Sequence, residues 1–398
     1  MATNPKLADL LKRNAPVLDS LYSFLTIADV QRLHRVCKAF WWLSDDIRSR
    51  LKTKLKTKLK QFVDEPQTFL QQLKVNRGLV HGLFVLNVLT LNRSQDRFLD
   101  VHVEHGAPFD SFADYLENTE HYVLQSIETK YSIYGRGSAT ATTIRLRAYN
   151  GAPGQAILNS SFTTADVNVI SWNKIYSVFP SMTIDDHEFY PLKPLDDSFG
   201  VHLKELSRHG WTTRDLRWPD TTTRPLRGSG QRRFGDSLSL VFQLGDDSME
   251  LTDLEITMFS RSIEYSQFDV IEVQLPRLGF GRAASNGGMN PIPFPRSSIR
   301  MEVNEVASPA LRFRYTCGDK THHKSWFQFI EERLRRWALV ELFKMSPEGR
   351  PNNFANAGPP QNFRISLPSG FEAPKDWDYA DDQMPPWFDF WEKQKDPA

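Results

Sequence analysis

Three side chains that could ligate a metal ion alternate along the segment RFLDVHVEHG, residues 97–106. Asp100, His102 and Glu104 are spaced two residues apart, so they share one face if the segment is a strand. Carboxylate and imidazole groups on one face can bind a divalent cation. Alternating polar residues are also typical of the solvated face of a strand, and the pattern favours this second interpretation. The opposite face would carry Leu99, Val101 and Val103.

Other residues that could take part in catalysis or binding have simpler structural interpretations. His322 and His323 are adjacent, so their side chains diverge, and we expect them at the polar start of a helix. The glycines at 227–230 and 279–281 lack the strand-to-helix context that a phosphate-binding loop requires, and they are interpreted as loop residues. No serine has the surroundings of a nucleophile elbow. The sequence therefore predicts no catalytic residue and no cofactor.

Predicted helices and strands interleave in the region that holds these residues. Helices are expected at 78–89 (GLVHGLFVLNVL) and 111–123 (SFADYLENTEHYV). Strands are expected at 97–104, 142–149 and 166–172. This alternation indicates a sheet with helices packed on it.

The next region, residues 191–345, is predicted to be a β-rich extension ending in a helix. Strands are expected at 236–244, 254–259 and 269–275, loops at 227–233 and 279–295, and the helix at 325–343. Beyond Ser346 the chain is rich in Pro, Gly and Asn and then becomes acidic and aromatic. This composition predicts a disordered tail, although its Trp and Phe content leaves open that it folds on a partner.

A lysine-rich near-repeat, LKTKLKTKLK, occupies residues 51–60 of a predicted N-terminal helical region. Leu51, Leu55 and Leu59 fall on one helical face. The lysines, at positions 52, 54, 56, 58 and 60, are predicted to form the solvated face of a helix that continues the N-terminal bundle. A basic nuclear-targeting patch is an additional hypothesis for the same lysines.

The segment PVLDSLYSFLTIADVQRLHRVCKAFWWLS, Pro16 to Ser44, resembles an F-box. The resemblance rests on Phe24, Asp29 and Lys38, together with eight residues expected to contact a partner: Pro16, Leu18, Leu21, Leu25, Leu33, Val36, Cys37 and Phe40. The family usually begins with Leu-Pro and an acidic residue, whereas this chain has Ala15-Pro16-Val17. The resemblance implies that these residues bind a Skp-type adaptor of a cullin-RING ubiquitin ligase. The alternative is that they pack onto the α/β region instead.

A second resemblance, to a family of fungal proteins with a nucleotidyltransferase-like domain behind an F-box-like N-terminus, covers roughly residues 15–345. It is carried by residues 78–86, 97–106, 168–184 and 207–219. Active nucleotidyltransferases have Gly-Ser on a helix, an Asp-x-Asp or Asp-x-Glu strand and a third acid on a later strand, because two metal ions must clamp the reacting oxygens. Here the corresponding positions read Gly82-Leu83 and Phe98-Leu99-Asp100, and the strand at 142–149 carries arginines. The resemblance implies a scaffold that has lost catalysis.

Composition limits the classes of partner. Forty-nine Lys and Arg residues against 48 Asp and Glu give a net charge of +1, so no overall charge favours nucleic acid or anionic lipid. Two cysteines, Cys37 and Cys317, are too few for a disulfide framework and fit a reducing compartment. The longest nearly apolar run, residues 78–91, is shorter than the roughly 20 residues that span a bilayer. We therefore expect a cytoplasmic or nuclear protein without membrane or nucleic-acid partners.

These observations predict an α+β protein in four parts: an F-box-like helical unit (13–72), a degenerate nucleotidyltransferase-like domain (73–190), the β-rich extension (191–345) and the tail (346–398). The predicted function is that of a substrate receptor in a Skp-cullin-F-box ligase, with an unknown protein substrate and no enzymatic activity. Two alternatives stay open. One is an active metal-dependent nucleotidyltransferase that uses Asp100, and the other is an adaptor-independent scaffold.

Overall fold

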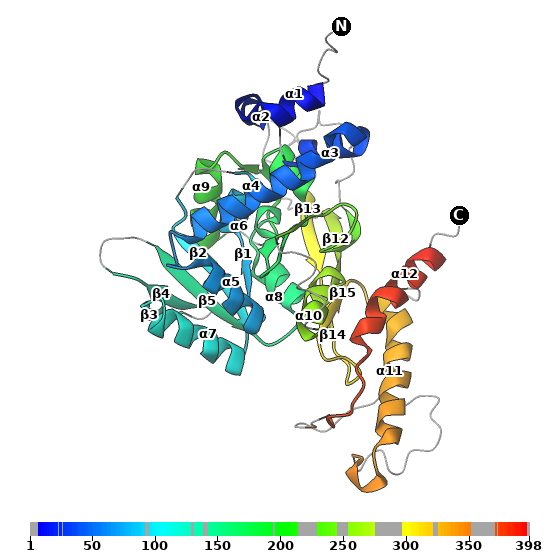
Figure 1. Ribbon diagram of the computed structural model, residues 1–398. Helices are drawn as coiled ribbons and strands as arrows, with labels where there is room; N and C mark the ends of the chain where they lie inside the picture. The colour runs from blue at the N-terminus through cyan, green and yellow to red at the C-terminus, as the bar shows by residue number, and fades with distance from the viewer. Residues whose placement is uncertain are drawn as a thin grey trace, which may run out of the picture.

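One eight-stranded mixed sheet organises the chain in the computed structural model (Figure 1). Its strands, in spatial order, are β11 (Leu240–Gln243), β7 (Lys174–Ser177), β6 (Asn168–Ile170), β1 (Leu79–His81), β2 (Phe98–Glu104), β5 (Thr143–Tyr149), β4 (Ser132–Gly135) and β3 (Val123–Ile127). Neighbouring strands are antiparallel except for the parallel pair β2 and β5. The structure describes residues 7–22, 24–25, 27–91, 95–128, 131–137, 142–193, 196–213, 229–244, 254–274, 297–320, 325–351, 371 and 373–395.

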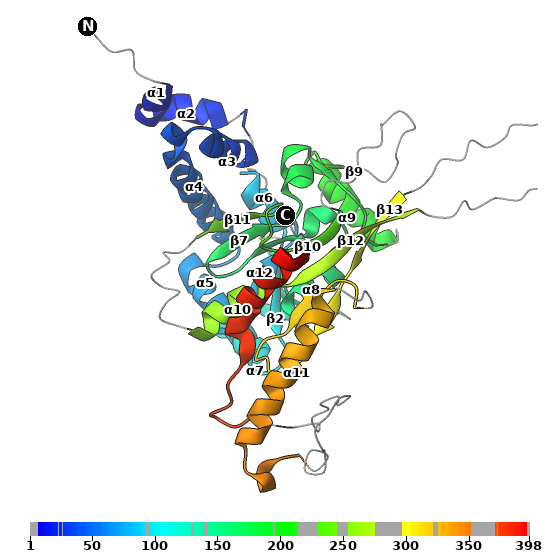
Figure 2. The same cartoon turned by 90° about the vertical axis from the view of Figure 1, so that its right-hand side faces the viewer.

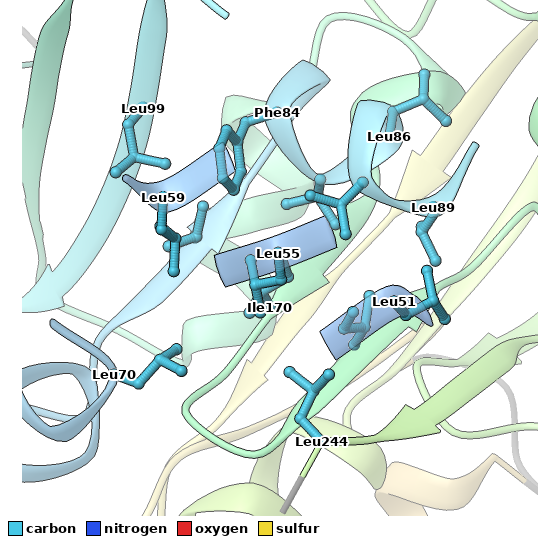
Figure 3. Packing of buried hydrophobic residues seen from close by; sticks show 14 of the residues in the cluster. Leu51, Leu55, Leu59, Leu70, Phe84, Leu86, Leu89, Leu99, Ile170 and Leu244 are labelled. Carbon is cyan, nitrogen blue, oxygen red and sulfur yellow. The ribbon is translucent and has the colours of Figure 1, made fainter. Parts of the chain in front are cut away.

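Helices α4 (Trp42–Leu59), α5 (Pro66–Val75), α6 (Leu83–Leu89) and α7 (Ala107–Asn118) contribute to one apolar core with the sheet. Leu51, Leu55 and Leu59 of α4 are fully buried in it, and Figure 3 shows them beside Leu99 and Ile170 of the sheet. Leu99, Val101 and Val103 are also fully buried, which confirms the predicted apolar face of β2. The two-residue period of β2 and the helical period of α4 therefore place their apolar sides against each other.

A second apolar core lies under the later part of the chain. Four helices contribute to it: α8 (Pro153–Ser160), α10 (Leu254–Glu264), α11 (Trp326–Lys344) and α12 (Met384–Lys395). Two small sheets complete it. One has the strand order β10 (Gly230–Arg233), β12 (Gln267–Gln274), β13 (Ser297–Glu302), and the other pairs β14 (Asn304–Val306) with β15 (Tyr315–Cys317). Leu79 and Val169 of the main sheet belong to this core, so the sheet separates the two cores.

The N-terminal helices α1 (Leu7–Arg13), α2 (Ala15–Tyr22) and α3 (Ile27–Val36) lie at one end of α4 (Figure 1). The Tyr22 hydroxyl donates to Asp46 of α4 over 2.8 Å. Arg32 of α3 donates a hydrogen bond to Asp185 over 2.5 Å. Asp185 ends a π-helical turn at Ser181–Asp185. This turn is followed along the chain by β8 (Glu188–Phe189), α9 (Asp197–Arg208) and β9 (Thr212–Thr213). These contacts tie the N-terminal helices to both α4 and the body of the protein.

Several predicted elements need correction. Residues 254–259 form part of α10 and not a strand, because Met258, Phe259 and Ile263 are buried on one side of a helix. Residues 78–89 form β1 and then α6, with the break at Gly82, whose φ of +85° favours glycine. The described part of the predicted loop 227–233 forms β10, whereas 279–295 and the pair His322-His323 lie outside the described residues.

The C-terminal segment 373–395 is ordered, contrary to the predicted disordered tail. Met384, Phe388 and Trp391 of α12 recur at helical spacing and are buried in the second core. The rings of Phe388 and Trp391 lie 5.2 and 5.6 Å from that of Trp326 on α11. Figure 2 shows α12 folded back along α11. The composition of the segment did not predict this helix. The helix is stabilised by a few aromatic residues whose spacing places them on one buried side.

The lysine-rich face of α4 is solvated only in part. Lys52, Lys56 and Lys60 are exposed, as predicted, but Lys58 is fully buried and forms an ion pair with Asp96 over 2.6 Å. No helix within the described ranges combines the length and apolarity needed to cross a membrane.

Candidate functional site

An ion pair between neighbouring parallel strands occupies the centre of the predicted relic site. Asp100 of β2 lies opposite Arg145 of β5. Arg145 Nη2 donates to Asp100 Oδ2 over 2.5 Å, and its Nε donates to Oδ1. Burial alone would lower the pKa of Arg145, but the charge and hydrogen bonds of Asp100 reverse this effect and raise it. The carboxylate is therefore matched by a cation within the protein itself.

Phe98, predicted from the sequence to stand in place of an acid, contacts the same arginine. The guanidinium carbon of Arg145 lies 4.4 Å from the centre of the Phe98 ring and 5.4 Å from that of Tyr131. Such cation–aromatic contacts are attractive. Phe98, Arg145 and Asp100 thus form one interacting set with a single carboxylate, whereas a two-metal site needs several converging carboxylates.

The structure also brings Gly82 to this site. A Cβ atom at Gly82 would lie 3.6 Å from Asp100 Oδ2, so the bare backbone of this turn faces the carboxylate. Leu83, the next residue, begins α6 and packs against the first core. The four positions singled out in the sequence, Gly82, Leu83, Phe98 and Asp100, therefore lie around one turn and strand, but they do not form a metal-binding set with the groups present.

Two histidines on the same sheet face are buried against each other. His81 lies opposite Asp100 and His102 opposite Leu79, and the two imidazole rings meet edge to face at 4.3 Å. Neither ring nitrogen of either histidine has a hydrogen-bond partner in the described part of the chain. Burial lowers the pKa of both imidazoles, that of His102 well below 6.5. This face of β2 is therefore not solvated at His102, contrary to the favoured sequence interpretation.

Asp100, His102 and Glu104 are also not arranged as the ligands of one metal ion. Glu104 is half-buried and lies 3.3 Å from Arg77 Nη1. Within the described ranges, no group of three or more His, Cys, Asp and Glu side chains is arranged to hold a metal ion. The residues present around Asp100 do not fit the metal pair of a nucleotidyltransferase, because the Asp100 carboxylate already forms an ion pair with Arg145.

A second charged pair, Asp166 with His202 of α9, lies within electrostatic reach of the site. His202 Nε2 is 2.8 Å from an oxygen of Asp166, whose carboxylate also accepts the hydroxyl and backbone N–H of Thr163. Burial opposes both charges, but the pair lowers the pKa of Asp166 and raises that of His202. This pair was not recognised from the sequence, because its two members are far apart along the chain and belong to no motif.

Asp96 is held away from the site. Its carboxylate accepts from Lys58 Nζ and from Asn87 Nδ2, each over 2.6 Å, within the first core. It therefore joins α4 and α6 to the segment before β2 and has no part in the chemistry around Asp100.

The predicted adaptor-binding residues divide into two groups. Leu18 is buried, and Leu21, Leu25, Leu33 and Phe40 are half-buried against the first core. Pro16 and Cys37 are exposed, and Val36 lies in α3, where its side chain is outside the described set. Most apolar residues of the motif thus point into the protein, where they share a core with α4.

Two aromatic side chains of the N-terminal helical region point outward instead. Phe24, after α2, has 85% of its surface exposed, and Trp41, before α4, has 58%. Lys12 of α1 lies 5.8 Å from the Trp41 ring centre. Val17 of α2 is also exposed. Phe24 belongs to the F-box-like pattern but was not among the residues predicted to bind the adaptor, and Trp41 belongs to neither set.

No protein-family model, curated protein or solved structure matches the chain. The resemblances to an F-box and to a nucleotidyltransferase therefore stay predictions that rest on the residues quoted above.

Proposed function

We propose that this protein is a non-catalytic interaction protein of the cytoplasm or nucleus. Its N-terminal helices bind a Skp-type adaptor of a cullin-RING ligase, and its α/β body presents a protein substrate. The observation that carries this proposal is the exposure of Phe24 and Trp41 beside helices whose leucines from the F-box-like segment are buried or half-buried. Large exposed aromatic residues are the side chains that most often anchor protein interfaces.

The adaptor part of the proposal is supported by the order of features along the chain. Exposed Pro16 and Val17 precede Phe24, and exposed Cys37 precedes Trp41, all within the F-box-like segment. The packed leucines hold the helices in place, so the exposed residues are presented on a fixed support. The surface expected to bind the adaptor is thus defined by Val17, Phe24 and Trp41, and not by the leucines.

The non-catalytic part is supported by the Phe98–Arg145–Asp100 set. A two-metal transferase needs converging carboxylates to hold its cations. Arg145 places a positive charge at that point, where it competes with a metal ion for Asp100 and repels it. Nucleotide transfer by Asp100 is therefore not the function that this geometry favours.

An adaptor-independent scaffold is the second candidate, and one observation favours it. Leu18, Leu25 and Phe40 belong to or pack against the same core as the sheet, as they would if the helices served only to complete the body. In that case Phe24 and Trp41 would have no role in binding an adaptor.

Capture of a purified Skp-type adaptor by the tagged full-length chain separates the two candidates. The wild type is expected to retain the adaptor, and Phe24→Asp to lose it. Phe343→Asp, at an exposed phenylalanine of α11, is the matched control and should retain it. If the folded wild-type chain captures no adaptor, the scaffold is favoured and the ligase role is overturned.

A further inference from the structure

Strand β3 forms an outer edge of the eight-stranded sheet. It pairs with β4 on one side, and no described strand pairs with its other side. All five of its side chains are exposed, including Val123 at 66% and Ile127 at 75%. An edge strand leaves backbone N–H and C=O groups available to a further strand. β3 therefore combines free backbone groups with exposed apolar side chains.

Few of the usual protections are present on this edge. Proteins commonly blunt an edge strand with lysine, proline, a bulge or a covering element. The sequence of β3, VLQSI, contains no charged residue and no proline. A register shift between Leu124 and Ser126 is the single irregularity that its pairing with β4 shows. At the opposite edge, by contrast, Leu240 and Phe242 of β11 are buried.

The helix beside β3 carries exposed acidic side chains. Residues 105–128 contain five carboxylates and no lysine or arginine; one of the five, Glu120, is buried and pairs with Arg136 after β4. Asp110, Asp114 and Glu117 lie exposed on α7, which runs beside β3 and β4 in Figure 1. Burial raises the pKa of Tyr134, the cross-strand neighbour of Leu124, and the charges of Glu117 and Asp114 raise it further. The acidic side chains of α7 therefore lie near the β3–β4 ladder.

We propose that the free edge of β3 binds an extended segment of a partner protein that adds one strand to the sheet. The segment is apolar at alternate positions, which suits the exposed side chains of β3, and carries lysine or arginine, which suits the acidic α7. Main-chain hydrogen bonds supply affinity in this mode, and side chains supply selectivity. The identification of this segment as the substrate rests on the proposed role as a substrate receptor.

A second copy of this chain fits the same edge less well. Five residues make a strand about 17 Å long, which suits a short peptide, whereas a stable dimer buries roughly 1,200 Å² or more. A second copy would also bring its own acidic helix to the shared edge, so that like charges would oppose pairing. The charge of the edge thus favours a basic peptide over self-association.

Fluorescence anisotropy with the full-length chain tests the proposal without any adaptor, so its outcome is independent of the ligase role. The probe is a labelled peptide of about nine residues that alternates valine and threonine and carries lysines at both ends. Three matched probes replace the lysines by glutamates, methylate alternate backbone amides, or keep the composition in a scrambled order.

Binding of the first peptide alone is the expected result, and it should weaken about tenfold or more with Ile127→Lys, which places a charge on the edge. Asp114→Asn with Glu117→Gln should weaken it less and reduce its dependence on salt. Val201→Lys, at an exposed valine of α9, should leave it unchanged. The proposal is overturned if the amide-methylated peptide binds equally well or if Ile127→Lys has no effect. It is also overturned if light scattering shows a wild-type dimer that Ile127→Lys dissociates.

Discussion

Arg145 and Asp100 form a two-point ion pair in which Nη2 and Oδ2 are separated by 2.5 Å. The pair links the only parallel neighbours of the eight-stranded sheet. It gives the carboxylate a partner within the chain, and Phe98 covers the cation from one side. Phe98, Arg145 and Asp100 therefore form one interacting set, so a change at any one of them alters the surroundings of the other two.

Restoring the acids should restore metal binding. The double variant Phe98→Asp/Arg145→Asp places two further carboxylates on the face of Asp100, about 5–7 Å from it. We expect it to bind Mn²⁺ in calorimetry, whereas the wild type should show no binding that depends on Asp100. Adding Asp100→Asn to the double variant is the control and should abolish the heat. Mn²⁺ binding by the wild type that Asp100→Asn removes would contradict the account.

Acid should destabilise the protein through His81 and His102. Their pKa values are lowered from 6.5 in the folded state, so below about pH 6.5 the unfolded chain binds more protons. The free energy of unfolding should therefore fall with decreasing pH, by at most about 1.4 kcal/mol per pH unit for each histidine. His202 acts in the opposite sense, because its raised pKa stabilises the fold below 6.5 and this contribution is lost as pH rises through the folded value.

Urea unfolding between pH 7 and pH 5 isolates the contribution of His102. His102→Leu should reduce the pH dependence of the unfolding free energy by up to one proton, whereas His105→Leu, at an exposed histidine, is the matched control and should follow the dependence of the wild type. Equal slopes for His102→Leu and the wild type would show that the buried imidazole does not resist protonation.

The buried ion pair between Lys58 and Asp96 should be sensitive to removal of one partner. Lys58→Met leaves the Asp96 carboxylate buried without its cation and is expected to cost about 3–5 kcal/mol in urea unfolding. Lys56→Met changes an exposed lysine of the same helix and should stay within about 0.5 kcal/mol of wild type. A small effect of Lys58→Met would mean that the pair is solvated.

The C-terminal helix should contribute to global stability. Trp391 is buried against Trp326 and Phe388, so Trp391→Ala is expected to cost about 3–5 kcal/mol, measured by the far-ultraviolet circular dichroism of urea unfolding. Phe390→Ala, at a half-exposed neighbour on the same helix, should cost clearly less. Equal and small effects would indicate that α12 is not docked in solution.

Periodicity predicted the parts of the fold that depend on local patterns. The apolar face of β2 and the long helix α11 follow from spacings of two and of three to four residues. Residues 254–259 were expected to form a strand, but they belong to a helix in which Phe259 is buried together with Ile263, so tertiary packing selects the helix.

The candidate site was predictable only in part. The departures at Phe98 and Leu83 are visible in the sequence, but the pairing of Asp100 with Arg145 depends on which strands become neighbours. Burial of His102 and Lys58 likewise depends on what packs over them, which alternation alone does not specify. The predicted adaptor-binding residues left out Trp41, and also Phe24, which the F-box-like pattern includes, because exposure and not helical spacing distinguishes these two.

Calorimetric titration of the full-length chain with a purified Skp-type adaptor tests the central claim most directly. The account predicts one adaptor bound per chain, with affinity reduced about 30-fold or more by Phe24→Asp/Trp41→Asp, since anchoring aromatic residues contribute about 2 kcal/mol or more. Phe343→Asp should bind like the wild type. Absence of binding by the folded wild type, or equal binding by Phe24→Asp/Trp41→Asp, would contradict it.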